Sequence, residues 1–207
     1  MVTVVNHPLV LYRLSLMRDK RTPVSQFRRL TNEIGQLMAY EVFRDLPMTD
    51  VPIETPLQKM LAPTLAPNPV TLVSILRAGD GLLVGFLEAM PNAAVGHIGL
   101  SRDHVTLLPR EYLSSLPTQV KGGDVVVLDP MLATGGSALY AVHKLKEYGA
   151  KGIKLVCLVA APEGLSAFDE AHPDVPVFTA AIDDHLNEIG YIVPGLGDAG
   201  DRIFGTL

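Results

Sequence analysis

One segment limits the fold of this chain more than any other: a run of four apolar residues followed by an acid. Residues 125–128 are Val-Val-Val-Leu, and Asp129 comes directly after them. A strand that is apolar at every position has both faces buried, which is typical of a parallel sheet covered by helices. The segment therefore predicts an α/β fold with Asp129 at the carboxyl end of a central strand.

From residue 70 onward, short apolar runs alternate with helical patterns. This alternation predicts a mostly parallel, twisted sheet flanked by helices. We expect strands at 70–76, 94–100, 124–128, 153–160 and 177–182, and helices at 80–89, 137–148 and 164–171. The chain has 207 residues, of which 48% are hydrophobic, so we expect one domain, 1–207, built around a core at 70–182.

Three segments flank that alternation. Residues 1–46 predict two helices, the second with Thr22 as N-cap and Pro23 in the first helical position. Residues 47–69 hold six prolines, which favours a connector of loop or edge structure. Residues 183–207 are rich in glycine, and because such backbone is costly to order, we expect a functional use for it.

Charge and cysteine content narrow the class of protein. The net charge of −5 disfavours a nucleic-acid coat protein, and the single cysteine, Cys157, excludes a disulfide framework. Cys157 lies in an apolar run, so we expect a core residue there and not a nucleophile. Since no apolar run reaches the ~20 residues of a membrane span and no signal-peptide pattern appears, we expect a cytoplasmic protein without membrane contact.

Basic residues gather at one end of the sequence. Residues 1–44 contain seven lysines and arginines and three acids, a net charge of +4, which leaves −9 for the remainder. One interpretation is a solvated face, or a basic surface that meets an acidic one in an oligomer. The other is a contact with an anion or RNA.

The turn after the central strand has the composition of a phosphate site. It consists of Asp129, Pro130, Met131, Leu132, Ala133, Thr134, Gly135, Gly136 and Ser137. Glycines let backbone N–H groups approach a phosphate, and the following helix N-terminus favours negative charge. Thr134 and Ser137 add hydroxyl donors, which leaves Asp129 to accept hydrogen bonds from a polyol. The alternative is an ordinary strand–turn–helix connection.

Other charged residues follow strands at the same edge. Arg77 and Arg102 suit a pyrophosphate because a guanidinium group can donate two parallel hydrogen bonds to phosphate oxygens, although surface ion pairs are the alternative. The stretch from Arg102 to Pro117 has no clear core pattern and predicts a mobile arm that closes over the ligand. Residues 183–185 (Asp-Asp-His) form another group of polar side chains. They could bind a metal ion, and the alternative is that they form a turn.

These segments resemble a known family. Residues 125–137 resemble the loop of type I phosphoribosyltransferases that binds phosphoribosyl pyrophosphate (PRPP), and Asp-Pro-Met-Leu-Ala-Thr-Gly-Gly-Ser is similar to the uracil phosphoribosyltransferase branch in particular. The tail at 190–206 resembles the base-binding hood of that branch. Asp80 departs from the pattern, because it stands where the family often has an apolar residue.

The resemblance implies a reaction and a set of site residues. The expected reaction is uracil plus PRPP giving UMP and pyrophosphate, with Asp129, Arg77 and Arg102 as catalytic residues. The PRPP site would comprise Arg77, Arg102, all nine residues of 129–137 and Asp198. The uracil site would comprise Ile192, Gly197, Asp198 and Ala199, which would act largely through backbone groups.

The resemblance also implies partners. Mg²⁺ would be held by PRPP without direct protein ligands, with Asp198 reaching it through water. A homodimer or larger homo-oligomer is expected, with GTP as a candidate allosteric activator. Two alternatives stay open: a phosphoribosyltransferase for another base such as hypoxanthine, or a regulatory protein that binds PRPP or a nucleotide together with RNA.

Overall fold

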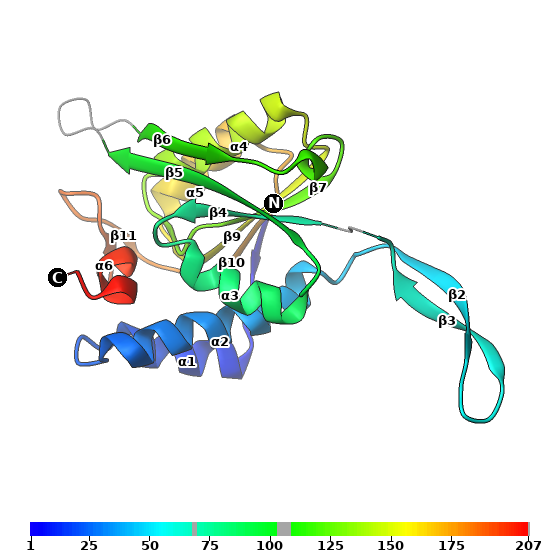
Figure 1. The fold of residues 1–207 in the computed structure, drawn as a ribbon. Coiled ribbons are helices and arrows are strands. Elements are labelled where there is room, and N and C mark those ends of the chain that lie inside the picture. The colour runs from blue at the N-terminus through cyan, green and yellow to red at the C-terminus, as the bar shows by residue number, and fades with distance from the viewer. Residues whose placement is uncertain (68–69, 103–108, 207) are drawn as a thin grey trace.

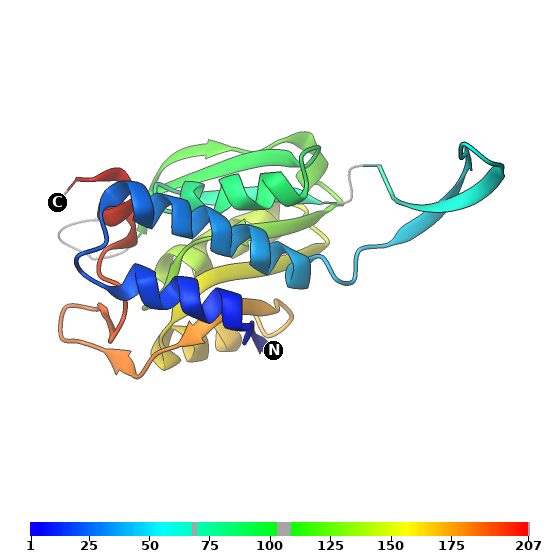
Figure 2. The ribbon, with the colours of Figure 1, turned by 90° about the horizontal axis from the view of Figure 1, so that it is seen from below.

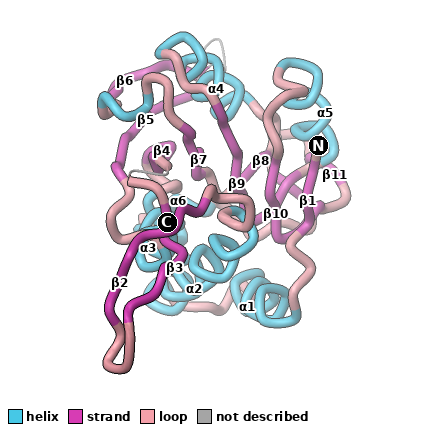
Figure 3. The backbone as a smooth tube through the Cα atoms, turned by 90° about the vertical axis from the view of Figure 1, so that its right-hand side faces the viewer, coloured by secondary structure: helices cyan, strands magenta, loops and turns pink. Residues whose placement is uncertain are grey.

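The computed structural model describes residues 1–67, 70–102 and 109–206, without the side chains of Arg102 and Pro109. An eight-stranded sheet forms its centre. Seven strands lie side by side in the order β1 (Val2–Val4), β10 (Val177–Ile182), β9 (Gly152–Ala160), β7 (Asp124–Leu128), β4 (Thr71–Leu76), β5 (Ala94–Arg102) and β6 (Pro109–Ser115) (Figure 3). All neighbours are parallel except β6, which runs antiparallel to β5. The eighth strand, β8 (Met131–Leu132), extends the pairing of β9.

Helices cover both faces of the sheet, as Figures 1 and 2 show. One face carries α1 (Pro8–Arg18), α2 (Val24–Val42) and α3 (Asp80–Ala89), and the other carries α4 (Gly136–Tyr148) and α5 (Pro162–Ala171). The expected α/β fold with a mostly parallel sheet is confirmed. No helix in the described part of the chain is long and apolar enough to cross a membrane.

The central strand shows why its sequence is apolar throughout. Val126 and Leu128 pack in the core beneath α1, α2 and α3, whereas Val125 and Val127 pack in the core beneath α4 and α5. Both faces are therefore buried, as the unbroken apolar run predicted. Cys157 of β9 is fully buried in the second core, and this burial raises the pKa of its thiol to about 12, which confirms a core role.

The start of α2 differs from the prediction. Pro23, with φ −69° and ψ 156°, is the N-cap residue, and the helix begins one residue later, at Val24. Thr22 does not cap the helix, because its hydroxyl donates to the carbonyl oxygen of Leu16 at 2.6 Å. The side chain closes the turn between α1 and α2 instead.

The proline-rich connector contains a regular element. It forms an antiparallel hairpin of β2 (Met48–Glu54) and β3 (Lys59–Leu65) that projects away from the body of the molecule (Figure 1). Each strand has a free edge, so prolines such as Pro52 and Pro63 can lack a donor without breaking the ladder between the two strands. Edge structure was expected here, but an extended hairpin was not.

Two further segments are more ordered than expected. The tail contains β11 (His185–Leu186), β12 (Ile192–Val193) and α6 (Ala199–Phe204), and is not irregular throughout. The stretch after Arg102 includes β6, followed by the 3₁₀ turn η1 (Thr118–Val120). Glu111 of β6 accepts hydrogen bonds from Tyr140 and Lys144 of α4, which fixes this strand on the sheet edge. The tip of the expected arm, 103–108, lies outside the described residues.

Candidate active site

The loop after β7 is fastened to the neighbouring strand β9. Asp129 N–H donates to the Val156 carbonyl at 3.1 Å, and the Pro130 carbonyl accepts from Leu158 N–H at 2.9 Å. Met131 and Leu132 then pair with β9 as β8. Since the Leu132 side chain is buried in the core, this residue has only its backbone to offer a ligand.

Beyond β8 the loop closes around a small cavity. Its volume is about 90 Å³, and its lining comprises Asp129 and residues 131–138. Gly135 caps α4 in the left-handed conformation (φ +85°), which a residue with a Cβ rarely adopts. The first N–H groups of α4 have no partner within their own helix, so the cavity offers them to an anion. The cavity is also lined by the half-buried Ser137 and the exposed Thr134, whose hydroxyl groups can donate to the same anion.

Asp129 is the acid of this cavity. Burial raises the pKa of its carboxyl group to about 7, and a hydrogen bond from the backbone of Met131 lowers it only in part. The group therefore changes protonation near neutral pH. When ionised, it can accept hydrogen bonds from two hydroxyl groups of a sugar.

Arg77 lies in the turn that follows β4, directly beside the end of β7. The peptide bond before it is cis. Gly79 of the same turn lies so close to β7 that a Cβ there would overlap the carbonyl oxygen of Leu128. The Arg77 side chain is 56% exposed, lies 3.4 Å from an Asp201 carboxylate oxygen and sits over the ring of Phe204. The guanidinium group thus lies against the tail, and Asp201 is the one acceptor that it has among the described residues, although it carries five N–H donors.

The structure gives Asp80 a defined set of contacts. It opens α3, and its carboxylate accepts a hydrogen bond of 2.5 Å from the buried Ser74 hydroxyl on β4. That hydroxyl also lies 3.1 Å from Nδ1 of His97 on β5. Asp80 therefore connects the Arg77 turn with the two strands beneath it. The polar residue at this unusual position is explained by Ser74 and His97, and these contacts were not predicted.

The tail folds over the same edge of the sheet. Gly197 has φ +78°, Asp198 caps α6 by accepting from Asp201 N–H at 2.9 Å, and Ala199 is buried. The Ile192 side chain is 4% exposed and packs in the core, so only its backbone can meet a base. Three of the expected uracil residues thus follow one another along a single turn.

Close approaches join the tail to the other two segments. A Cβ at Gly190 would lie 3.7 Å from the Thr134 side chain, and one at Gly200 would lie 3.9 Å from Ala78. The structure therefore brings three segments together at the carboxyl ends of the strands, where open α/β sheets bind ligands. They are the loop at 129–137, which is predicted to bind a phosphate and is called the phosphate loop below, the Arg77 turn and the tail. Arg102 ends β5 at this edge, but its side chain lies outside the described residues.

Several basic residues of the first segment make contacts within the molecule. Arg18 pairs with Asp183, Arg13 with Glu33 and Arg44 with Glu41, while Arg28 donates to the carbonyl oxygen of Ile203. Arg21 and Arg29 stay largely exposed, so the interpretation of this segment as a solvated face, an oligomer contact or a contact with an anion or RNA stays a prediction. The contact of Arg18 corrects the suggested metal cluster at 183–185, because Asp183 binds Arg18 and no metal-binding group of three His, Cys, Asp or Glu residues occurs among the described residues.

Cavity size does not identify this site. A cavity of about 410 Å³ lies at the opposite edge of the sheet, beside Asp45, Lys146 and Lys154. Two of the three lysines that line it are engaged with acids of the chain, Lys146 with Asp174 and Lys154 with Asp45. The smaller loop cavity is the better candidate because its donors face an unfilled space at the ligand-binding edge.

The sheet, the anchored glycine-rich loop and the tail across the strand ends define a type I phosphoribosyltransferase. The family model for uracil phosphoribosyltransferase matches residues 4–206. This chain belongs to the uracil phosphoribosyltransferase family. A relative from Rhizobium rhizogenes with that name is 58% identical over 205 residues, covering 99% of this chain and 98% of its own. One from Ligilactobacillus salivarius is 56% identical over 203 residues, covering 98% and 97%.

Solved structures share this fold. A protein from Aquifex aeolicus is 37% identical with a TM-score of 0.94, covering 99% of this chain and 98% of its own. The orotate phosphoribosyltransferase of Mycobacterium tuberculosis, solved with PRPP, is 16% identical with a TM-score of 0.52, covering 86% and 91%. The second likeness concerns the fold alone.

Proposed function

We propose that this chain transfers the phosphoribosyl group of PRPP to uracil, giving UMP and pyrophosphate. The observation that carries the proposal is the meeting of the phosphate loop, the Arg77 turn and the glycine-rich tail at one edge of the sheet. The family match over almost the whole chain supports uracil as the base.

The reaction replaces one bond at C1 of the ribose with another. A ring nitrogen of uracil forms the new C–N bond, the C1–O bond to pyrophosphate breaks with its electron pair, and the nitrogen loses its proton. The positive charge that develops on the ribose requires a positioned leaving group and the exclusion of water. Holding the reactants in line can contribute ~7–11 kcal/mol, so positioning supplies much of the catalysis.

Each segment has a part in this arrangement. Residues 133–137 bind the 5-phosphate through backbone N–H groups and the hydroxyls of Thr134 and Ser137, and Asp129 accepts hydrogen bonds from the ribose hydroxyls. Arg77 and Arg102 bind the pyrophosphate. Mg²⁺ arrives with PRPP and offsets the charge of the leaving group; Asp198 uses Oδ1 to cap α6, and its second oxygen suits a magnesium-bound water.

The backbone of the tail discriminates between bases. Cytosine presents a donor where uracil presents an acceptor, so peptide groups placed for uracil are left unpaired. Each unpaired buried group costs ~1–3 kcal/mol, and two of them would reject cytosine by roughly 30-fold to more than 10⁴-fold.

Three further properties belong to this proposal. A homo-oligomer is supported by apolar side chains exposed on the projecting hairpin, such as Leu57 (94% exposed) and Leu61 (64%). Activation by GTP rests on the resemblance, and a cytoplasmic location rests on the lack of an apolar run long enough to span a membrane. Sedimentation, together with the assay below repeated with GTP, tests the first two.

The assay combines purified protein, PRPP, Mg²⁺ and labelled uracil, with cytosine, hypoxanthine and orotate in parallel. UMP from uracil alone is the expected result. A nucleotide of another base would assign the enzyme to that base, and binding of PRPP without any product would favour a regulatory protein.

A further inference from the structure

The base-binding turn is built of backbone, so something else must hold it in place. Peptide groups recognise a base only if they keep their positions before the base arrives. The segment in question, 195–199, contains two residues with positive φ, Gly195 and Gly197, and has no long helix or strand of its own. Its position therefore depends on contacts from elsewhere in the chain.

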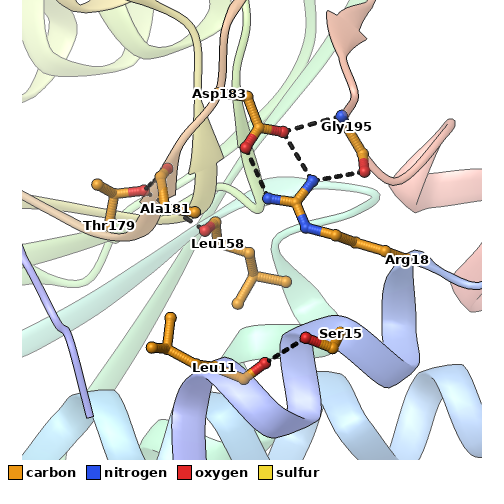
Figure 4. A network of polar contacts seen from close by, with 8 residues as sticks. All are labelled: Leu11, Ser15, Arg18, Leu158, Thr179, Ala181, Asp183 and Gly195. Carbon is orange, nitrogen blue, oxygen red and sulfur yellow. Dashed lines mark hydrogen bonds and ion pairs between the residues drawn. The ribbon is translucent and has the colours of Figure 1, made fainter. Parts of the chain in front are cut away.

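A partly buried ion pair makes the closest such contact. Arg18, the last residue of α1, donates from Nη2 to Asp183 Oδ1 at 2.6 Å and from Nη1 to Asp183 Oδ2 at 2.7 Å (Figure 4). Asp183 follows the end of β10, and its side chain is only 5% exposed. The two residues are 165 positions apart, so the pair ties the N-terminal helix to the exit of the sheet.

Both partners also bind the backbone of Gly195. Arg18 Nη1 donates to its carbonyl oxygen at 2.6 Å, and its N–H donates to Asp183 Oδ2 at 2.8 Å (Figure 4). The ion pair thus provides hydrogen-bond partners for both the N–H and the C=O group of Gly195, which is the first residue of the turn expected to contact the base.

Gly195 fits this place only because it is a glycine. It has φ +60°, and a Cβ there would overlap the carbonyl oxygen of Ile192. The turn therefore closes tightly on Ile192, another residue expected to present its backbone to uracil. A displacement at Gly195 would move both sides of the base-binding surface.

A second arginine holds the turn from its other side. Arg202 donates to the carbonyl oxygens of Leu196 and Asp19, both at 2.7 Å, and its guanidinium lies 4.3 Å from the ring centre of Phe27. Asp19 directly follows Arg18 along the chain. The turn between α1 and α2 is thus attached to two successive residues of the tail, Gly195 and Leu196.

We propose that the Arg18–Asp183 ion pair is a positioning unit for base recognition, which fixes the Gly195 backbone so that the following turn is ready for uracil. The proposal rests on the proposed function for the identity of the base. Neither residue touches the base, so both act through Gly195. This assigns a role within the site to one member of the basic N-terminal segment.

The test compares Arg18→Lys, Arg18→Ala and Asp183→Asn with wild type. Lysine keeps the charge but cannot form the two parallel hydrogen bonds and the third bond to Gly195. We expect KM for uracil to rise by roughly 10-fold or more, since small misplacements of bound groups cost up to ~10²-fold. Binding of ribose 5-phosphate, which needs only the loop at 129–137, should stay within about 2-fold of wild type.

Arg13→Ala is the matched control. Arg13 also lies on α1 and forms a half-buried ion pair of 2.7 Å, but its partner is Glu33 on α2. This variant should keep wild-type KM for uracil. If it raises KM as Arg18→Ala does, the effect belongs to α1 in general, and the positioning role is overturned; an unchanged KM in Arg18→Ala overturns it as well.

Hydrogen exchange separates this inference from the proposed function. In the unliganded protein, amides 195–199 should exchange faster in Arg18→Lys and Asp183→Asn than in wild type, and should be unchanged in Arg13→Ala. If the wild-type protein forms no UMP, the proposed function is overturned. The exchange comparison would still show whether the ion pair holds residues 195–199 in place. Unchanged exchange in all variants would overturn the positioning role even in an active enzyme.

Discussion

Gly164 at the start of α5 touches the phosphate loop at Ala133. A Cβ at Gly164 would lie 2.8 Å from the Leu132 carbonyl oxygen and closer still to that of Ala133. The glycine therefore lets α5 support the loop from behind, at the point where the loop leaves β8.

Gly164→Ala should weaken both the fold and the phosphate site. In an open helix, replacing glycine with alanine stabilises by about 0.5–1 kcal/mol, so a fall in unfolding free energy would show that the clash outweighs helix propensity. We expect ribose 5-phosphate affinity to fall by roughly 10-fold, measured by calorimetry. Ser166→Ala, exposed on the same helix, is the control and should change neither quantity.

Asp129→Asn should change how stability depends on pH. The raised pKa, about 7 against the ordinary value of 3.8, means that the folded protein holds this proton more tightly than the unfolded chain. Wild-type stability should therefore decrease as pH rises from about 4 to 7, by up to about 1.4 kcal/mol for each pKa unit of difference. Urea unfolding at pH 5 and pH 8 measures this slope.

Asparagine removes the titration, so Asp129→Asn should show a flatter slope between those two pH values. It should also lose most UMP formation, since an amide offers ribose hydroxyls one acceptor in place of a carboxylate. A slope equal to that of wild type would contradict the assignment of the buried proton to Asp129.

Arg77→Ala should weaken PRPP binding and leave uracil binding nearly unchanged. A hydrogen bond to a charged group contributes about 1.5–3 kcal/mol, which corresponds to a rise in KM for PRPP of roughly 10- to 150-fold. Steady-state kinetics with each substrate varied in turn separates the two constants. Arg21→Ala, which removes an arginine with an 84% exposed side chain, should keep both.

Gly195→Ala should raise KM for uracil because the added Cβ would displace the Ile192 carbonyl. Gly122→Ala is its control, since Gly122 also has positive φ (+78°) but its Cβ would meet only Lys151, at 4.0 Å. Both variants carry the backbone strain, and only the first carries the clash. If Gly195→Ala and Gly122→Ala have the same KM for uracil, the close packing of Gly195 against the Ile192 carbonyl does not affect uracil binding, and this prediction is wrong.

Asp80→Leu should destabilise the protein by about 1–3 kcal/mol, because the buried Ser74 hydroxyl loses its carboxylate acceptor. Asp80→Asn keeps an oxygen at the same place and should cost less. Thermal unfolding of the two variants checks this order. A leucine variant as stable as wild type would show that the Ser74 contact contributes little.

Much of the core was predictable because its signals are local. The unbroken apolar run at 125–128 indicated a strand buried on both faces, and the small residues at 133–137 indicated a turn that opens a helix. Both features depend on neighbours within a few residues, and burial in the structure follows the same pattern. The central strand and the turn that opens α4 could therefore be predicted from the sequence.

The side of the site that is expected to bind the base could not be predicted in the same way, because it depends on contacts between distant parts of the chain. Arg18 looked like one of several surface charges, and Asp183 like part of a metal cluster, yet they meet across 165 positions at Gly195. Likewise, the sequence offered no explanation for an acid at position 80, and the structure explains Asp80 by placing Ser74 and His97 beside it. Local periodicity reports which side of a strand or helix is buried, but partner choice between charged side chains depends on how the helices and the tail pack in three dimensions.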